Sequence, residues 1–173
     1  MPNWSVRWGC HVTEILMRQA LVNSVDEVLG KMFFAETMGE VPGAEPAEDR
    51  ADEIAAGLTF EGEPSGSLLL RLTTAAARQI AADFLGIDET EISENQISEV
   101  VRELTNMICG SVLSRVESAA TFNLGAPRIV PPSEEPAGSL TNTRYCVQLS
   151  NGRLTVHVYT GIALCPQPAQ SAY

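Results

Sequence analysis

The chain has 173 residues, 45% of them hydrophobic and 19% charged, which is the balance of an ordinary globular protein. A domain of this length buries roughly 70% of the surface that its unfolded chain exposes, so it needs no disulfide or structural metal. The formal net charge of -11 argues against nucleic acid and against an anionic membrane as partners, because phosphate groups would be repelled.

The first half of the sequence predicts a long helix followed by a β-hairpin. A helix is expected over residues 13–34, where apolar side chains recur at helical spacing: Ile15, Leu16, Leu21, Val25, Val28, Leu29 and Met32. Residues 35–53 are rich in Pro, Gly, Ala and acidic side chains, which predicts a loop with one short strand early in it. Residues 58–62 and 65–73 predict two antiparallel strands joined by the turn around "EGEPSG".

A short helix is expected over residues 75–86, "AAARQIAADFLG", directly after this hairpin. Thr73 or Thr74 is a candidate N-cap, because a threonine hydroxyl can accept a hydrogen bond from the first free backbone N–H groups. Gly86 is expected to end the helix, since glycine adopts the left-handed conformation of a C-cap without strain.

The second half predicts a long helix, an edge strand and a second hairpin. The helix is expected to run from about 96 to 118, with Ser93 and Gln96 forming a capping box at its start. Residues 124–139, "LGAPRIVPPSEEPAGS", predict an edge strand or an extended segment broken by prolines. Strands over 144–150 and 153–164 flank the dipeptide Asn-Gly, which is the strongest hairpin signal in the chain.

Two long helices are therefore each followed by a hairpin, which suggests an internal duplication. A spacing near 76 residues places Glu27 opposite Glu103 and Gly30 opposite Asn106. The expected fold is α+β, with two long helices packed on an antiparallel sheet in pseudo-twofold halves. We expect one domain over 1–173.

The second long helix carries an unusual polar stripe. Its core-facing residues are Ile97, Val100, Val101, Leu104, Met107, Ile108, Val112 and Val116. Glu99, Glu103, Asn106 and Gly110 lie together on the other face, because residues three and four apart are neighbours on a helix. A plain solvated face is one interpretation. However, Asn and Gly are poor helix formers, costing several tenths to ~1 kcal/mol each relative to Ala.

A site made of Glu and Asn limits the chemistry that this stripe can perform. It offers no nucleophile and no metal cluster, but an Asn side chain has one acceptor and two donors with which to hold and aim a water molecule. Such a group is useful where the substrate is already activated. An aspartyl phosphate on another protein fits, because positioning the attacking water supplies most of the catalysis.

The segment "ELTNMICG" (103–110) resembles the signature of the CheC/CheX/FliY phosphatases of bacterial chemotaxis, most closely the CheX branch. Pro127 in "LGAPRIV" stands at the distance from this motif that the family's proline has, and "GSLLLRLTTAAARQIAADFLG" resembles the family's strand and short helix. The likeness covers a core of about residues 15–163. Residues 166–173 are expected to be a flexible tail.

The resemblance implies a phosphatase that dephosphorylates the aspartyl phosphate of a CheY-type response-regulator receiver domain. Asn106 would orient the attacking water and Glu103 would pair with a receiver lysine, with Glu99 and Gly110 contacting the partner. The Mg²⁺ ion would belong to the receiver, and this chain would bind no cofactor. Gly30 in place of a first Asn leaves one site, which supports the CheX branch. The family also implies a homodimer paired through sheet edges.

The rival interpretation is a non-catalytic adaptor or switch-complex module that binds a receiver or a flagellar rotor protein. The family includes scaffolds of this kind, and the sequence alone does not separate them from enzymes. A small-molecule enzyme is a weaker third interpretation, because no pocket chemistry is visible beyond the stripe.

The remaining reactive residues point to packing rather than chemistry. The cysteines contain no CxxC pair and stand far apart, at 10, 109, 146 and 165. His11 has no further ligand at metal-site spacing, His157 is expected to have a structural or surface role, and Cys109 is expected to pack. The start of the chain shows no signal peptide, and no stretch approaches the ~20 apolar residues of a membrane span. We expect a cytoplasmic protein.

Overall fold

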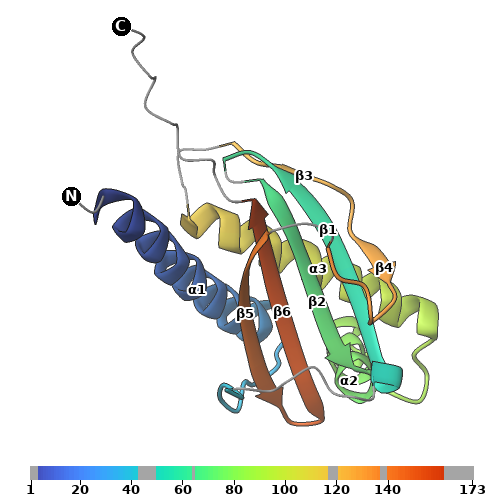
Figure 1. Cartoon of the computed structure of the whole chain (residues 1–173). Helices are drawn as coiled ribbons and strands as arrows, with labels where there is room; N and C mark the ends of the chain where they lie inside the picture. Colours follow the sequence, from blue (N-terminus) through green and yellow to red (C-terminus); the bar gives the residue numbers. More distant parts are fainter. Residues whose placement is uncertain (1–3, 43–49, 64, 117–120, 137–139, 162–173) are drawn as a thin grey trace, which may run out of the picture.

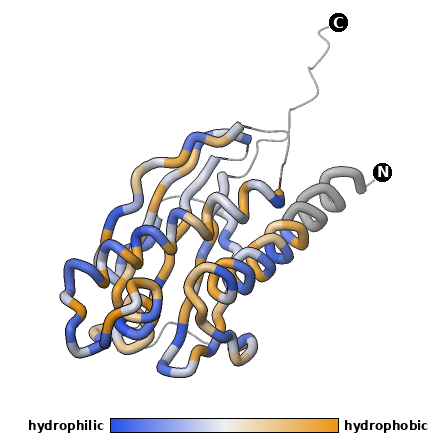
Figure 2. The backbone as a smooth tube through the Cα atoms, turned by 180° about the vertical axis from the view of Figure 1, so that it is seen from behind, coloured by the Kyte–Doolittle hydropathy of each residue, from blue (hydrophilic) through white to orange (hydrophobic). Residues whose placement is uncertain are grey.

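The computed structural model describes residues 4–42, 50–63, 65–116, 121–136 and 140–161, with the side chains of 4–13, 50 and 140 left out. Within these residues, three helices lie on one face of a six-stranded antiparallel sheet (Figures 1 and 2). The predicted α+β class, with two long helices on an antiparallel sheet, is confirmed. None of the described helices is long and apolar enough to cross a membrane. The expected tail, 166–173, lies outside the described residues.

Helix α1 (Trp4–Met32) begins nine residues before the predicted start at 13. The prediction began at the first apolar repeat, whereas residues 4–12 contain no proline, and Gly9, at a cost of about 1 kcal/mol, does not stop a helix. The helix ends at Met32 rather than at Phe34, because Phe34 adopts a left-handed conformation (φ 54°). The Ala35 N–H then donates to the Leu29 carbonyl at 3.0 Å, closing the last turn.

Helix α2 (Thr74–Leu85) has the predicted end but not the predicted cap. Gly86 is left-handed (φ 66°), and the following Ile87 N–H donates to the Ala82 carbonyl, as expected of a glycine C-cap. Thr73 stands at the N-cap but makes no capping hydrogen bond. Its hydroxyl instead accepts a hydrogen bond from the Arg153 N–H at 3.2 Å. The Thr73 hydroxyl, which the local sequence pattern predicted to cap the helix, therefore makes a contact with a distant strand.

Helix α3 (Glu94–Val116) begins with the predicted capping box. The Ser93 N–H donates to Gln96 Oε1 at 2.9 Å, and the Gln96 N–H donates to Ser93 Oγ at 3.3 Å. Because Ser93 is the N-cap, the helix starts two residues before the predicted position, 96. Its predicted end near 118 falls where the structure does not describe the chain.

The sheet follows the predicted hairpins, with a longer first strand in each hairpin. Its strands are β1 (Glu53–Glu61), β2 (Gly66–Thr73), β3 (Asn123–Leu124), β4 (Arg128–Val130), β5 (Leu140–Leu149) and β6 (Gly152–Gly161). β1 begins five residues before the predicted start at 58, and β5 begins four before 144. The predicted edge strand is two short pieces, β3 and β4, with Pro127 between them, where it need not donate to a strand ladder.

The strand order shows the two predicted halves. β2 and β6 pair at the centre, β1 flanks β2, and β5 flanks β6. β3 and β4 pair with the outer edge of β1, and Glu40 forms a bridge with Val147 on the outer edge of β5. Each half thus runs as a long helix, a short outer segment and a hairpin, which confirms the pseudo-twofold arrangement.

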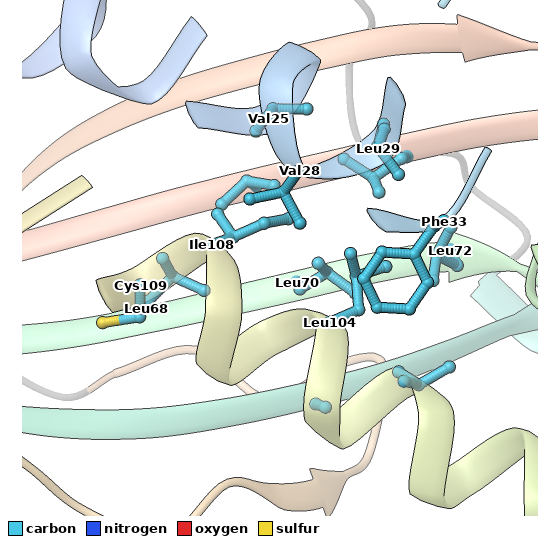
Figure 3. Close-up of a cluster of buried hydrophobic side chains, with 14 of the residues drawn as sticks. Val25, Val28, Leu29, Phe33, Leu68, Leu70, Leu72, Leu104, Ile108 and Cys109 are labelled. Atoms are coloured by element: carbon cyan, nitrogen blue, oxygen red, sulfur yellow. The ribbon is translucent and has the colours of Figure 1, made fainter. Parts of the chain in front are cut away.

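The core lies between the sheet and the two long helices. Figure 3 shows side chains of α1, α3 and β2 pointing toward one another across this layer: Val25, Val28, Leu29, Phe33, Leu68, Leu70, Leu72, Leu104, Ile108 and Cys109. All are 6% exposed or less, so burial of apolar surface fixes which face of α3 turns inward. The opposite face of α3 is thereby held toward solvent.

Gly152, at the turn between β5 and β6, is expected to tolerate no side chain. Its φ of 144° disfavours any other residue, and a Cβ atom there would overlap Thr73 Oγ1 and lie 3.0 Å from Thr73 Cβ. We expect Gly152→Ala to lower the free energy of unfolding by about 2 to 3 kcal/mol in chemical denaturation. Gly86→Ala, also at positive φ but with open space around the added Cβ, is the control and should cost about 1 kcal/mol. Equal losses would contradict a steric role for Thr73.

Candidate functional site

The predicted stripe lies on the outer face of α3. Glu99 and Glu103 are exposed, and Asn106 and Gly110 are half-buried. The inward face is more extensive than the sequence predicts, because Thr105 and Leu113 are buried along with the residues expected there: Ile97, Val100, Val101, Leu104, Ile108, Cys109 and Val112. Met107 and Val116, expected in the core, are half-buried at its border.

Most charged side chains around the stripe form ion pairs within the chain. Arg102 binds the Glu99 carboxylate one turn away, and Arg78 of α2 binds Glu94. In contrast, Glu103 makes no ion pair with any residue that the structure describes. Sequence reasoning treated Glu99 as free to meet a partner and overlooked Arg102, although opposite charges three residues apart on a helix are a recognised pairing.

Asn106 follows Glu103 by three residues, so the two side chains share one patch of the helix surface. No described residue forms a hydrogen bond with the Asn106 amide. The amide therefore keeps its acceptor and two donors for solvent or a partner. Glu103 and Asn106 together form what we call the Glu–Asn pair.

Gly110 leaves an open patch of backbone one turn after Asn106. An added Cβ at this position would meet no described atom within 4 Å, so no packing contact among the described residues requires glycine here. The Gly110 carbonyl accepts a hydrogen bond from Ser114 Oγ at 2.8 Å. The bare surface beside the Glu–Asn pair is thus available for close approach by another molecule.

Cys109 borders the stripe but cannot act as a nucleophile. Its side chain is 1% exposed, and burial raises the pKa of the thiol to about 12, so the reactive thiolate is scarce at neutral pH. The expected packing role of Cys109 agrees with this position. Among the described residues there is also no cluster of three potential metal ligands.

His157 lies away from α3, on β6. Its ring stacks on Tyr159 with centroids 5.7 Å apart, and Nδ1 lies 3.2 Å from Asn142 Oδ1. These contacts agree with the expected structural or surface role of His157. The side chain of His11 lies outside the described residues.

The corresponding face of α1 is also solvent-facing. Gly30 is exposed with open space around it, as the alignment with Asn106 predicts. Glu27 pairs with Lys31 at 2.7 Å and with Arg115 of α3, and the Lys31 ammonium, with Arg115 adding to it, lowers the pKa of the Glu27 carboxyl. Unlike Glu103, Glu27 is committed to contacts within the chain.

The described ends of α1 and α3 do not fix which residues of the two helices correspond. Helix α1 ends at Met32, whereas residues 117–120, which follow Val116 of α3, lie outside the described part of the chain. The equivalence of Gly30 and Asn106 therefore stays a prediction, whereas the duplication itself follows from the strand order.

The side chains of this site can position a reacting molecule, but they cannot activate it. An unpaired carboxylate and an amide can hold a cation and a water molecule at fixed places on a rigid helix. The Glu–Asn pair itself supplies no positive charge to stabilise a transition state, and the described residues hold no cluster of three potential metal ligands. A substrate that reacts here must bring those with it.

Comparisons with known proteins agree with this fold. The family model described as "Chemotaxis phosphatase CheX" matches residues 54–150. CheX from Vibrio vulnificus superposes with a TM-score of 0.66 at 18% identity, covering 83% of this chain and 95% of that one. CheX from Desulfovibrio desulfuricans gives 0.66 at 19% identity, covering 84% and 99%.

A third solved structure is a complex. It contains CheX, CheY, BeF₃ and Mg²⁺ from Borrelia burgdorferi, and its matching chain gives a TM-score of 0.64 at 13% identity, covering 83% of this chain and 97% of that one. At these identities the structural matches show a shared fold. No curated protein matches the sequence.

Proposed function

The chain belongs to the CheX family of chemotaxis phosphatases, and from this premise we propose that it removes the phosphoryl group from an aspartyl phosphate on a CheY-type receiver domain. The observation that carries the proposal is the Glu–Asn pair. On the outer face of α3, Glu103 has no ion-pair partner and Asn106 no hydrogen-bond partner among the described residues. The Borrelia CheX complex with CheY supports a receiver as the partner.

In this mechanism Asn106 aims the attacking water. Its amide accepts one hydrogen bond from the water and fixes the oxygen in line with the bond to the leaving aspartate oxygen. Phosphoryl transfer of this kind depends on positioning and charge stabilisation. The receiver supplies the charge stabilisation through its own Mg²⁺, so this chain needs no metal.

Glu103 has the separate role of holding a receiver lysine. A carboxylate that is unpaired before docking loses no internal ion pair when it meets a cation in the interface, unlike Glu99 or Glu27. A charge-assisted hydrogen bond in a site that excludes water is stronger than an exposed one. Glu103 therefore contributes to affinity as well as to the geometry of the docked complex.

The decisive experiment measures the loss of phosphate from receiver domains that are encoded in the same genome as this protein. Each receiver is phosphorylated with a small-molecule phosphodonor, and its decay is measured with and without catalytic amounts of this chain. Faster decay with turnover supports the phosphatase. Saturable binding with an unchanged decay rate supports the alternative, a non-catalytic adaptor that binds a receiver or a rotor protein.

A larger side chain at Gly110, where the helix backbone is open, is expected to weaken receiver binding without harming the fold. Gly110→Leu adds a side chain where the proposed receiver approaches, and we expect a loss of receiver affinity of roughly tenfold or more. Gly30→Leu on α1 is the matched control, since both glycines are helical with open space around them. Both variants should unfold at slightly higher denaturant, because Leu is the better helix former by about 1 kcal/mol.

Receiver affinity is measured by titration calorimetry and stability by denaturant unfolding. An equal loss of affinity in the two variants would place the receiver elsewhere than beside the Glu–Asn pair. An unchanged affinity in Gly110→Leu would show that the receiver does not approach this turn of α3.

A further inference from the structure

A small pocket lies between the loop after α1, helix α2 and the turn that joins β5 to β6. In Figure 1 these three segments lie at the same end of the molecule. The pocket has a volume of 210 Å³, with Ala35, Ile80 and Leu149 among its apolar lining residues and Glu36 and Asp83 among its polar ones. None of its described lining residues belongs to α3, so we treat it as separate from the Glu–Asn pair and call it the acidic pocket.

The two carboxylates of the acidic pocket have no counterion within the described part of the chain. Glu36 and Asp83 are both exposed, and neither forms an ion pair with a described residue. Glu27 and Glu99, by contrast, are each held by a basic side chain. No Lys or Arg is among the described lining residues of the pocket. A hollow lined by charges of one sign concentrates the electric field and attracts the opposite charge.

An amide side chain completes the polar part of the acidic pocket. The Ser150 hydroxyl donates to Gln79 Oε1 at 3.0 Å, which fixes the orientation of the Gln79 amide. The Nε2 group of Gln79 makes no hydrogen bond with a described residue, so its two N–H donors can meet a carbonyl oxygen. The pocket thus offers acceptors for a cation and donors for a peptide carbonyl.

Phe34, which also lines the acidic pocket, is an unusual residue for its position. It has a left-handed conformation (φ 54°) at the end of α1, where glycine is the ordinary residue, and its side chain is 73% exposed. Only burial of the ring would offset the conformational cost, and the ring is not buried. A partner that covers Phe34 would supply that burial.

Other exposed apolar side chains stand next to the lining residues. Met38 is 68% exposed, and its N–H donates to the carbonyl of Gln148, the neighbour of Leu149. Phe84, the neighbour of Asp83, is 37% exposed and stacks on the buried ring of Phe33. Exposed apolar surface beside polar groups is typical of a protein interaction site. A free small molecule in the pocket would leave most of this surface uncovered.

We propose that the acidic pocket binds an arginine side chain of a partner protein, presented on an extended segment with apolar residues beside the arginine. The guanidinium meets Glu36 and Asp83, and the Phe34 ring packs on its face. Arginine fits better than lysine, because a planar guanidinium can bridge two carboxylates and stack on an aromatic ring. The apolar neighbours of the arginine cover Phe34 and Met38.

The size of the acidic pocket agrees with a single side chain as its occupant. Pockets that hold a drug-sized ligand or a cofactor have volumes of roughly 300 to 1,000 Å³, whereas this one has 210 Å³. The methylene stem of an arginine would lie against Ile80 and Leu149 while the charged end stays near the carboxylates. This inference does not depend on the proposed phosphatase activity.

The test titrates the full chain with a capped five-residue peptide that has a central arginine flanked by leucines. Binding is followed by NMR, and the amides of 34–36 and 79–83 should shift in a saturable way. A peptide with citrulline in place of arginine has the same shape without the charge and should bind at least tenfold more weakly. Agmatine, which carries a guanidinium but no peptide backbone, should bind at least fivefold more weakly, because it covers no apolar surface.

Charge-removing variants assign the binding to the two carboxylates. Asp83→Asn and Glu36→Gln should each weaken peptide binding roughly threefold, and the double variant roughly tenfold. Glu91→Gln is the matched control, since it removes the same charge from an exposed position outside the pocket lining, and it should bind as wild type does.

Phe34→Gly separates a role in binding from a role in the fold. Glycine adopts the left-handed conformation without strain, so we expect the folding equilibrium constant to rise roughly fivefold in denaturant unfolding. Peptide affinity should fall roughly fivefold at the same time, because the ring that packs on the guanidinium is gone. A side chain kept for stability would give the opposite result, a less stable variant with unchanged affinity.

Four results would overturn the proposal. No saturable shift at about 10 mM peptide, or equal binding of the arginine and citrulline peptides, would show that the pocket does not select a cation. Equal binding of agmatine and the peptide would assign the pocket to small amines. Equal affinities in Glu91→Gln and the Glu36 and Asp83 variants would place the peptide elsewhere. A less stable Phe34→Gly with wild-type affinity would assign the ring to the fold.

Discussion

Asn106→Ala is expected to reduce dephosphorylation to the receiver's own rate while receiver affinity changes by no more than about threefold. The amide acts on water in the transition state, and an interaction made only there affects turnover without affecting binding. The substitution should not harm the fold, because no described residue bonds to the Asn106 side chain. Alanine is also the better helix former, by several tenths of a kcal/mol.

The measurement pairs a phosphate-decay time course with a binding titration against the same receiver. Asn95→Ala, an exposed asparagine in the first turn of α3, is the control and should retain full activity. Wild-type decay rates in Asn106→Ala would show that water is positioned by another group. Decay rates that fall only because binding is lost would assign Asn106 to docking.

The parts of the fold that the sequence predicts are those set by local periodicity. The outer face of α3 follows from the spacing of its apolar residues, and the capping box at Ser93 and the glycine cap at Gly86 are local signals that the structure keeps. Thr73 fails as a cap because Arg153, distant in sequence, takes its hydroxyl. A local sequence pattern predicts which hydrogen bond a side chain can make, and the residues that pack around it in the folded protein decide which bond it does make.

Contacts between distant segments could not be predicted. Residues 38–41, which bond to β5, fall in a stretch where the sequence indicates one short strand, but their partner strand and the Arg18–Glu40 ion pair depend on how α1 lies against β5. The same holds for Arg115 of α3, which reaches Glu27 of α1. No local sequence pattern predicts such ion pairs, because the side chains meet only after the helices pack on the sheet.

The duplicated helices show a further limit. Residues four apart share a face of a helix, so an alignment of two amphipathic helices can slip by a turn and still match apolar positions. The strand order shows the two duplicated halves, but it does not show which residue of α1 corresponds to which residue of α3.

Glu103→Gln is expected to weaken receiver binding by roughly tenfold or more and to lower turnover at subsaturating receiver. The substitution keeps size and helix propensity but removes the charge that would meet the receiver lysine. Added salt should reduce the difference between wild type and variant, because it screens exposed charges before docking.

Glu99→Gln is the matched control for Glu103→Gln, since Glu99 lies one turn away with the same chemistry but is held by Arg102. Exposed pairs of this kind contribute about 0 to 1 kcal/mol, so Glu99→Gln should leave stability and receiver affinity nearly unchanged. If both variants lose affinity equally, the receiver responds to the overall negative charge of α3 rather than to one carboxylate. If Asn106→Ala loses as much affinity as Glu103→Gln, the division into a water-aiming amide and a lysine-binding carboxylate is wrong. The expected pattern, in which binding falls in Glu103→Gln alone and turnover falls in both site variants, requires the two residues of the Glu–Asn pair to act at different steps.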